Sequence, residues 1–156
     1  MAYVELARGH YPKARDVFSL AWYIYDLSKC IKEVYGGKNI IMDECYNPMF
    51  IAQQFCAVQR GQAYTRGVYH LVISFDPYID NANLMFANHV AQRICNLYPN
   101  YQSFFAVHEN TKALHIHIMF NNCPIFENCP KLTSLFNIMT VRRIVDEMID
   151  RHLGIV

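Results

Sequence analysis

The chain has 156 residues, of which 53% are hydrophobic and 17% are charged, and its formal net charge is +1. This length suits one domain, and so high an apolar fraction excludes a disordered chain. The near-neutral charge does not predict nucleic-acid binding, since proteins of that class usually carry a basic excess.

Hydrophobic segments in the chain are short. None approaches the length of about 18 residues that a membrane span needs, and no basic N-terminal region precedes an apolar core. We therefore expect no membrane insertion and a cytoplasmic location. No CxxC pair is present, so the six cysteines are expected to be reduced thiols: Cys30, Cys45, Cys56, Cys95, Cys123 and Cys129.

The first half of the chain predicts one strand and two helices. A short strand is expected over residues 2–7, and a helix over residues 17–31, capped by Asp16 and followed by the pair Gly36-Gly37. Residues 38–47 are expected to connect it to a second helix over residues 48–60, with Pro48 in the first turn and Gly61 after the end.

The second half adds three strands and two helices. Residues 68–75 are β-branched and aromatic, which predicts a strand near the centre of a sheet. A helix capped by Asp80 or Asn81 is expected to reach residue 97, and strands over residues 102–109 and 114–121 follow. A loop over 122–130, a short apolar piece over 132–136 and a last helix over 139–153 complete an α+β fold, with helices packed on a central antiparallel sheet.

Residues 114–121 alternate between two kinds of side chain. One parity holds His115, His117, Met119 and Asn121, and the other holds Leu114, Ile116, Ile118 and Phe120. Side chains two apart on a strand point the same way, about 7 Å from each other, so two imidazoles can lean onto one cation at roughly 2.1 Å from each nitrogen. The pattern therefore indicates two ligands of a metal site.

His108 is the candidate for a third ligand. If residues 102–109 form the preceding antiparallel strand and the chain reverses at Thr111-Lys112, His108 pairs directly with His115. Directly opposed Cβ atoms lie about 4.5 to 5.5 Å apart. A slip of one residue turns His108 to the other face, and Thr-Lys is a weak turn signal, so the site depends on this register.

Three landmarks, taken in this order, resemble the relaxase or mobilisation nuclease family, in particular the MobA/VirD2-like branch of the HUH endonucleases. The first is residues 22–25 (Trp-Tyr-Ile-Tyr) followed by Lys29, and the second is residues 69–75 (Tyr-His-Leu-Val-Ile-Ser-Phe). The third is the array of His108, His115, His117 and Asn121. The resemblance spans most of the chain and implies a single relaxase-like nuclease domain over residues 1–156.

This resemblance implies a metal-dependent, site-specific nickase of single-stranded DNA in a bacterial cytoplasm. His108, His115 and His117 would hold one divalent cation, Mg²⁺ or Mn²⁺. Tyr23 would attack the scissile phosphate at a transfer origin and form a 5′-phosphotyrosine, with Tyr25 as the alternative nucleophile. Accessory DNA-binding or coupling proteins are implied as partners.

The resemblance gives three further residues supporting roles. Ser74 would help to seat the DNA, and His70 lies on the same face of the strand over residues 68–75 as Ser74. Asn121 would orient one of the metal-binding histidines without itself binding the metal. The chain departs from the family at Asn110, where many relatives carry an aspartate. Three other readings stay open: a replication initiator or transposase of the HUH type, a non-catalytic DNA-binding accessory subunit, and a zinc-stabilised structural module.

Overall fold

The computed structural model describes residues 2–26, 29–42, 47–59 and 66–155. In this part of the chain the strands are β1 (Tyr3–Leu6), β2 (Cys30–Lys38), β3 (Val68–Ser74), β4 (Tyr101–His108) and β5 (His115–Pro124). The helices are α1 (Ala14–Ile24), α2 (Pro48–Gln59), α3 (Leu84–Cys95) and α4 (Ile138–His152), with a short 3₁₀ turn at Leu132–Ser134. None of these described helices is both long and apolar enough to span a bilayer.

The strands form one sheet in the order β1-β3-β5-β4-β2, and every neighbouring pair is antiparallel. The predicted α+β fold, with helices packed on an antiparallel sheet, is therefore confirmed. β3 lies inside the sheet as expected, but the middle position belongs to β5, which carries two of the candidate metal ligands.

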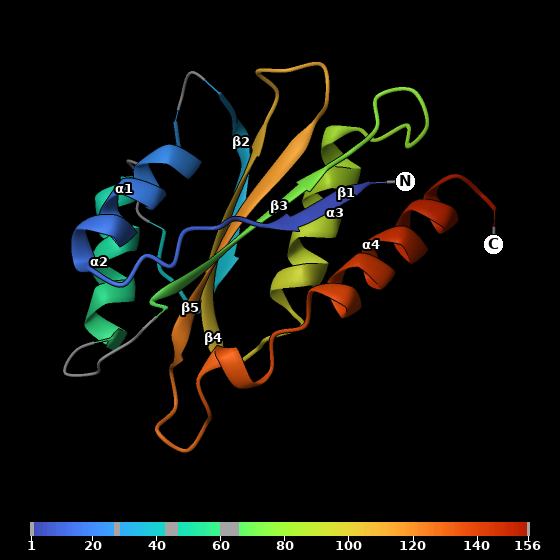
Figure 1. The fold of residues 1–156 in the computed structure, drawn as a ribbon. Coiled ribbons are helices and arrows are strands. Elements are labelled where there is room, and N and C mark those ends of the chain that lie inside the picture. Colours follow the sequence, from blue (N-terminus) through green and yellow to red (C-terminus); the bar gives the residue numbers. More distant parts are fainter. Residues whose placement is uncertain (1, 27–28, 43–46, 60–65, 156) are drawn as a thin grey trace.

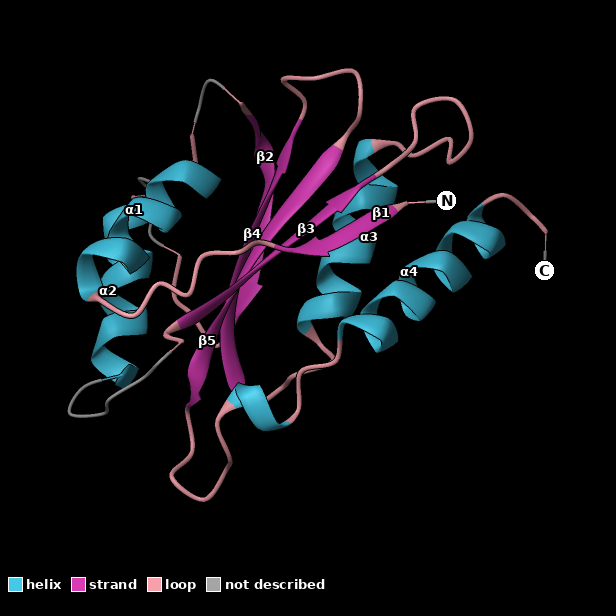
Figure 2. Cartoon of the chain, in the orientation of Figure 1, coloured by secondary structure: helices cyan, strands magenta, loops and turns pink. Residues whose placement is uncertain are grey.

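Helices cover both faces of this sheet. α1 and α2 lie on one face and α3 and α4 on the other (Figures 1 and 2). Beneath α3 and α4 is the larger apolar cluster, to which β5 contributes Ile116, Ile118 and Phe120. Beneath α1 and α2 is a smaller cluster, to which the sheet contributes Val68, Phe104, Ala106 and Met119. The alternation along β5 thus separates two cores.

The structure of residues 17–38 differs from the prediction, because part of this segment is the strand β2. The expected helix to residue 31 ends at Ile24, and Cys30–Lys38 forms an edge strand paired with β4. Gly36-Gly37 does not end a helix, although its sequence pattern predicts one, and a Cβ added at Gly37 would lie 2.1 Å from the Ser103 carbonyl oxygen. These glycines therefore permit close approach of two strands, a tertiary requirement that local patterns do not reveal.

Two predicted helix caps are also wrong. α1 begins one turn earlier than expected, and Asp16 lies inside it, where its carboxylate accepts a hydrogen bond from the Lys13 backbone N–H at 3.0 Å. α3 is capped by Asn83, whose side chain accepts from the Phe86 N–H at 2.8 Å, and not by Asp80 or Asn81. In these two helices the Asp and Asn residues mark the region where the helix starts but not the capping position.

The remaining expectations are close to the structure. α2 has the predicted start at Pro48, while Gly61, its expected end, falls outside the described residues. Cys45 also lies outside them, and the described thiols of Cys56, Cys95, Cys123 and Cys129 are free, as expected.

Candidate metal centre

The register of the β4–β5 hairpin brings the three histidines together. His108 pairs directly with His115, which confirms the predicted register, and His117 lies two residues further along the same face of β5. The ring centroids of His108 and His117 are 4.3 Å apart. The row extends across the sheet, because Ser74 of β3 pairs with His115 and Tyr3 of β1 pairs with Ser74.

The donor atoms of these histidines fit one cation. Each can offer one ring nitrogen, and the three nitrogens lie within 4.8 Å of one another. Two nitrogens bound at about 2.1 Å to the same ion can be at most about 4.2 Å apart. Small rotations of the rings are therefore enough to bring all three onto one cation.

Hydrogen bonds select which nitrogen each histidine can offer. His108 Nε2 donates to the Ile24 carbonyl at 2.7 Å, and His115 Nδ1 donates to the Ala113 carbonyl at 2.9 Å, since a carbonyl can only accept. His108 Nδ1 and His115 Nε2 are thereby left with their lone pairs. His117 Nε2 is buried and has no hydrogen-bond partner among the residues that the structure describes. A bound cation would satisfy this orphaned atom.

Two histidines of the site, His108 and His117, are held in the neutral form that a metal requires. Burial lowers the pKa of His117 to about 2, with further lowering from His108, His70 and His115. Burial also lowers the pKa of His108, and here the Ile24 carbonyl opposes the shift. Both imidazoles consequently keep their lone pairs at neutral pH.

Tyr23 and Tyr25 have different surroundings. Tyr23 is 44% exposed, and its ring meets His117 edge-on with centroids 5.3 Å apart. It also lies 6.1 Å from the rings of His70 and His108. Tyr25 is only 4% exposed and packs against Tyr35 in the smaller core. The structure therefore brings Tyr23, but not Tyr25, to the histidines.

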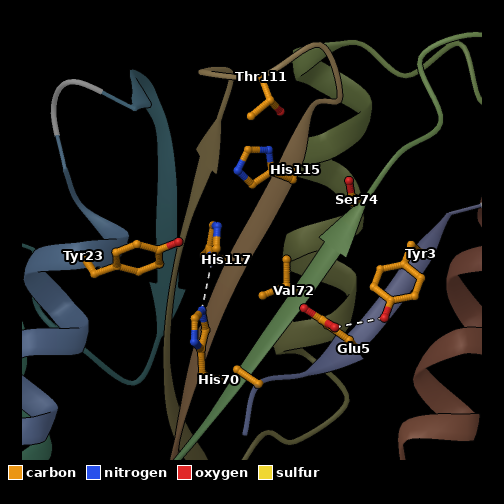
Figure 3. A pocket seen from close by; sticks show the side chains of 10 residues that line it. Tyr3, Glu5, Tyr23, His70, Val72, Ser74, Thr111, His115 and His117 are labelled. Carbon is orange, nitrogen blue, oxygen red and sulfur yellow. Dashed lines mark hydrogen bonds between the residues drawn. The ribbon is translucent and has the colours of Figure 1, made fainter. Parts of the chain in front are cut away.

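The end of α1 explains why Tyr23 and His108 meet. The last carbonyls of a helix have no partner within the helix, and the Ile24 carbonyl receives the His108 imidazole instead. The residue before it, Tyr23, extends from α1 toward His117 (Figure 3). One helix terminus thus orients a candidate ligand and presents a phenol beside it.

An open groove of about 510 Å³ runs over this face. Its walls come from β1, β3, β5 and α1 (Figure 3), and they include Ser74, His70, Glu5, Tyr23, His115 and His117. Ser74 and His70 thus lie where their shared parity places them. A groove of this kind can admit an extended chain from solvent to the histidines.

Asn121 shares the face of His117 but lies beneath α2. Its amide donates to the Phe55 carbonyl at 3.1 Å and to Gln102 Oε1 at 2.8 Å, and its Oδ1 accepts from Gln59 Nε2 at 2.8 Å. None of these partners is a histidine. The contacts give Asn121 a place in the packing of α2 on the sheet.

Lys29 and Glu5 belong to the site, although the sequence pattern assigns neither of them a role there. The Lys29 ammonium lies 4.6 Å from the Tyr23 ring centroid and 3.4 Å from the Asp26 carboxylate. Glu5 lines the groove, and it is aligned with His117 through Val72 because the three pair across β1, β3 and β5. The position of Glu5 near the histidines follows from the order of the strands in the sheet, which local sequence patterns do not reveal.

Comparison with known families agrees with this site. The nuclease-domain model of the MobA/VirD2-like relaxases matches residues 25–152. The chain therefore belongs to this family of relaxases, and that membership implies a DNA-nicking activity. The match covers the three histidines, Ser74 and His70, and it begins two residues after Tyr23. Among curated proteins, none matches the chain.

Proposed function

We propose that the protein is a metal-dependent transesterase that nicks single-stranded DNA at a transfer origin of a conjugative or mobilisable element, in the bacterial cytoplasm. The observation that carries the proposal is the edge-on contact of the exposed Tyr23 with His117, within the three-histidine cluster. Accessory DNA-binding or coupling proteins would deliver the origin, because a formal net charge of +1 gives the chain little general electrostatic attraction for DNA.

His108, His115 and His117 would hold Mg²⁺ or Mn²⁺. Such a cation supplies Lewis-acid polarisation of a phosphate oxygen and leaves its full charge available, because its three protein ligands are neutral. The chain's own contribution is to place the scissile phosphate between this cluster and Tyr23, with Ser74 beside His115 as a hydroxyl donor to the DNA.

In the reaction, the Tyr23 oxygen forms a bond to phosphorus and the bond from phosphorus to the 3′ oxygen breaks. The phenol loses its proton to solvent as it attacks, and the departing 3′ oxygen takes up one proton from solvent and leaves as a hydroxyl. The product is a 5′-phosphotyrosine whose bond energy allows the reverse reaction to rejoin the strand. Lys29, above the Tyr23 ring, would stabilise the developing phenolate.

A randomised single-stranded DNA library carrying a 3′ label tests the proposal without knowledge of the origin. In Mn²⁺, wild-type protein is expected to give a labelled covalent adduct on denaturing gels, and sequencing of the captured DNA identifies the site. Tyr23→Phe should give none, whereas Tyr25→Phe and the exposed control Tyr78→Phe should retain it.

Other outcomes have definite meanings. An adduct that persists in Tyr23→Phe but is lost in Tyr25→Phe reassigns the nucleophile to Tyr25. Wild-type protein that binds Mn²⁺ but captures no library member contradicts the proposed activity and favours a DNA-binding accessory subunit. The captured sequences separate a transfer origin from the replication origin or transposon end that the other HUH enzymes would select.

A further inference from the structure

A chain of hydrogen bonds extends from His117 away from the groove. His117 Nδ1 lies 2.9 Å from His70 Nε2, and His70 Nδ1 lies 3.2 Å from the Tyr11 hydroxyl oxygen. Both histidines are about 95% buried, at 4% and 5% exposure. These three side chains come from β5, β3 and the segment between β1 and α1, and we call them the His117–His70–Tyr11 relay.

The direction of the relay follows from the orphaned atom at its end. If His117 Nε2 presents its lone pair to a cation, the proton of the neutral ring must be on Nδ1, which then donates to His70 Nε2. His70 must in turn carry its proton on Nδ1 and donate to the Tyr11 oxygen. The relay therefore admits one arrangement of protons when His117 is a ligand.

The backbone around Tyr11 is built to place this residue. Tyr11 has a positive φ of 50°, a left-handed conformation that is unfavourable for a bulky residue. Its carbonyl approaches Gly67 so closely that a Cβ there would lie 2.2 Å from the oxygen. The left-handed backbone of Tyr11 and the glycine at position 67 thus together permit the position of Tyr11.

The other two candidate ligands have simpler supports. His108 and His115 each donate their second ring proton to a backbone carbonyl, of Ile24 and Ala113. Within the described ranges no carbonyl supports His117 in this way, and its partner is a second imidazole, that of His70. Metal-binding histidines generally need a partner of this kind, which fixes the tautomer and the ring orientation.

We propose that His70 and Tyr11 are positioning residues of the metal centre, which hold His117 in the tautomer and orientation that present Nε2 to the cation. This inference rests on the proposed metal centre. The relay is neutral, in contrast to a carboxylate partner, so it orients His117 without adding negative charge near the DNA phosphate. His70 thereby fixes the tautomer and ring orientation of His117, as the Ile24 carbonyl does for His108.

Binding of Mn²⁺, measured by calorimetry or by the loss of the free-ion signal in electron paramagnetic resonance, tests the relay without any DNA. His70→Phe keeps the ring but removes the acceptor, and we expect a loss of affinity of about 10-fold to 100-fold. His70→Gln restores an acceptor and should recover most of the affinity. Tyr11→Phe should lose about two- to five-fold, because it removes only the outer hydrogen bond.

Two controls match these variants in chemistry but lie on the surface. His89→Phe on α3 and Tyr78→Phe in the loop before it should bind Mn²⁺ as wild-type protein does. Long-range ¹H–¹⁵N correlation spectra of the metal-free protein give a second readout. They should show His117 protonated on Nδ1 in wild-type protein and in His70→Gln, and a mixture of tautomers in His70→Phe.

Several results would overturn the inference. One contrary result is a His70→Phe variant that binds Mn²⁺ with wild-type affinity. Another is an equal loss of Mn²⁺ affinity in His70→Phe and His70→Gln with an unchanged His117 tautomer. Either result would mean that His70 and Tyr11 contribute only to packing. Failure of the metal centre itself is recognised separately, by wild-type Mn²⁺ affinity in His115→Ala. Failure to nick DNA leaves all of these measurements intact, so it does not bear on the relay.

Discussion

His108 and His115 face each other across the β4–β5 hairpin, with ring centroids 5.3 Å apart. The pair is separated by only seven positions in the chain, and His117 follows two positions later. All three candidate ligands therefore come from one hairpin, which supplies the site before the rest of the sheet is considered.

Replacement of His115 should remove metal binding without unfolding the protein, because His115 is only partly buried. With Mn²⁺ at 100 times its dissociation constant, wild-type protein should gain about 2.7 kcal/mol in the free energy of unfolding. His115→Ala should lose this gain, and the exposed control His89→Ala should keep it. Thermal melts with Mn²⁺ and with a chelator measure both; complete unfolding of wild-type protein by the chelator would instead indicate a structural zinc module.

The metal-free protein should lose stability in acid. Burial and then the neighbouring His108 lower the pKa of His70 to about 4, whereas its ordinary pKa is 6.5. Between these values the unfolded chain binds more protons than the folded one, so the free energy of unfolding falls as the pH falls from 6.5 to about 4. At about 1.4 kcal/mol per pKa unit, His70 contributes on the order of 2 to 3 kcal/mol to this loss.

Melting at a series of pH values checks the acid sensitivity. His117, with a pKa lowered to about 2, adds a loss of the same sign that extends to lower pH. His70→Gln should have a shallower decline between pH 7 and about pH 4, since it removes one of the buried histidines whose pKa is lowered. The decline in His89→Gln should equal that of wild-type protein; a shallower curve there would mean that exposed histidines dominate.

Asn121 should matter for stability and not for metal binding. Asn121→Ala leaves Gln59, Gln102 and the Phe55 carbonyl without their shared partner, and unsatisfied buried groups cost about 1 to 3 kcal/mol each. We expect a loss of roughly 2 to 4 kcal/mol in denaturant unfolding, with Mn²⁺ affinity within about two-fold of wild type. A ten-fold loss of Mn²⁺ affinity at unchanged stability would instead assign Asn121 to the metal ligands. Asn88→Ala on the surface of α3 is the matched control.

Removal of the Lys29 charge should affect binding and chemistry in opposite directions. Its ammonium lowers the pKa of His108 and His117, as it would also repel a cation, so Lys29→Met should bind Mn²⁺ slightly more tightly. The same change removes the positive charge above Tyr23 and should slow adduct formation by about ten-fold. Lys38→Met, whose ammonium contacts Asn96 instead, should change neither quantity. A loss of both Mn²⁺ affinity and the rate of adduct formation in Lys29→Met would contradict these opposite effects.

The β4–β5 hairpin and its three candidate metal ligands could be predicted from sequence, because the features that bring these ligands together are local. Strand periodicity places His115 and His117 on one face, and the turn length decides whether His108 joins them. β2 could not be predicted, since Gly36-Gly37 acts through the distant Ser103 backbone. The contact of Tyr11 with His70 was equally hidden, because it depends on a left-handed backbone and on space left by Gly67.

Tyr23 and the candidate metal ligands rest on different parts of the protein. α1 is held by the smaller core that it shares with α2, whereas the sheet that carries the histidines is also fixed by the larger core under α3 and α4. The hydrogen bond from His108 to Ile24 links the two parts. If Tyr23 is the nucleophile and the histidines hold a cation, as proposed, displacement of α1 on gradual heating would stop the reaction while the cation is still bound. Inactivation and metal release would then occur as two successive events.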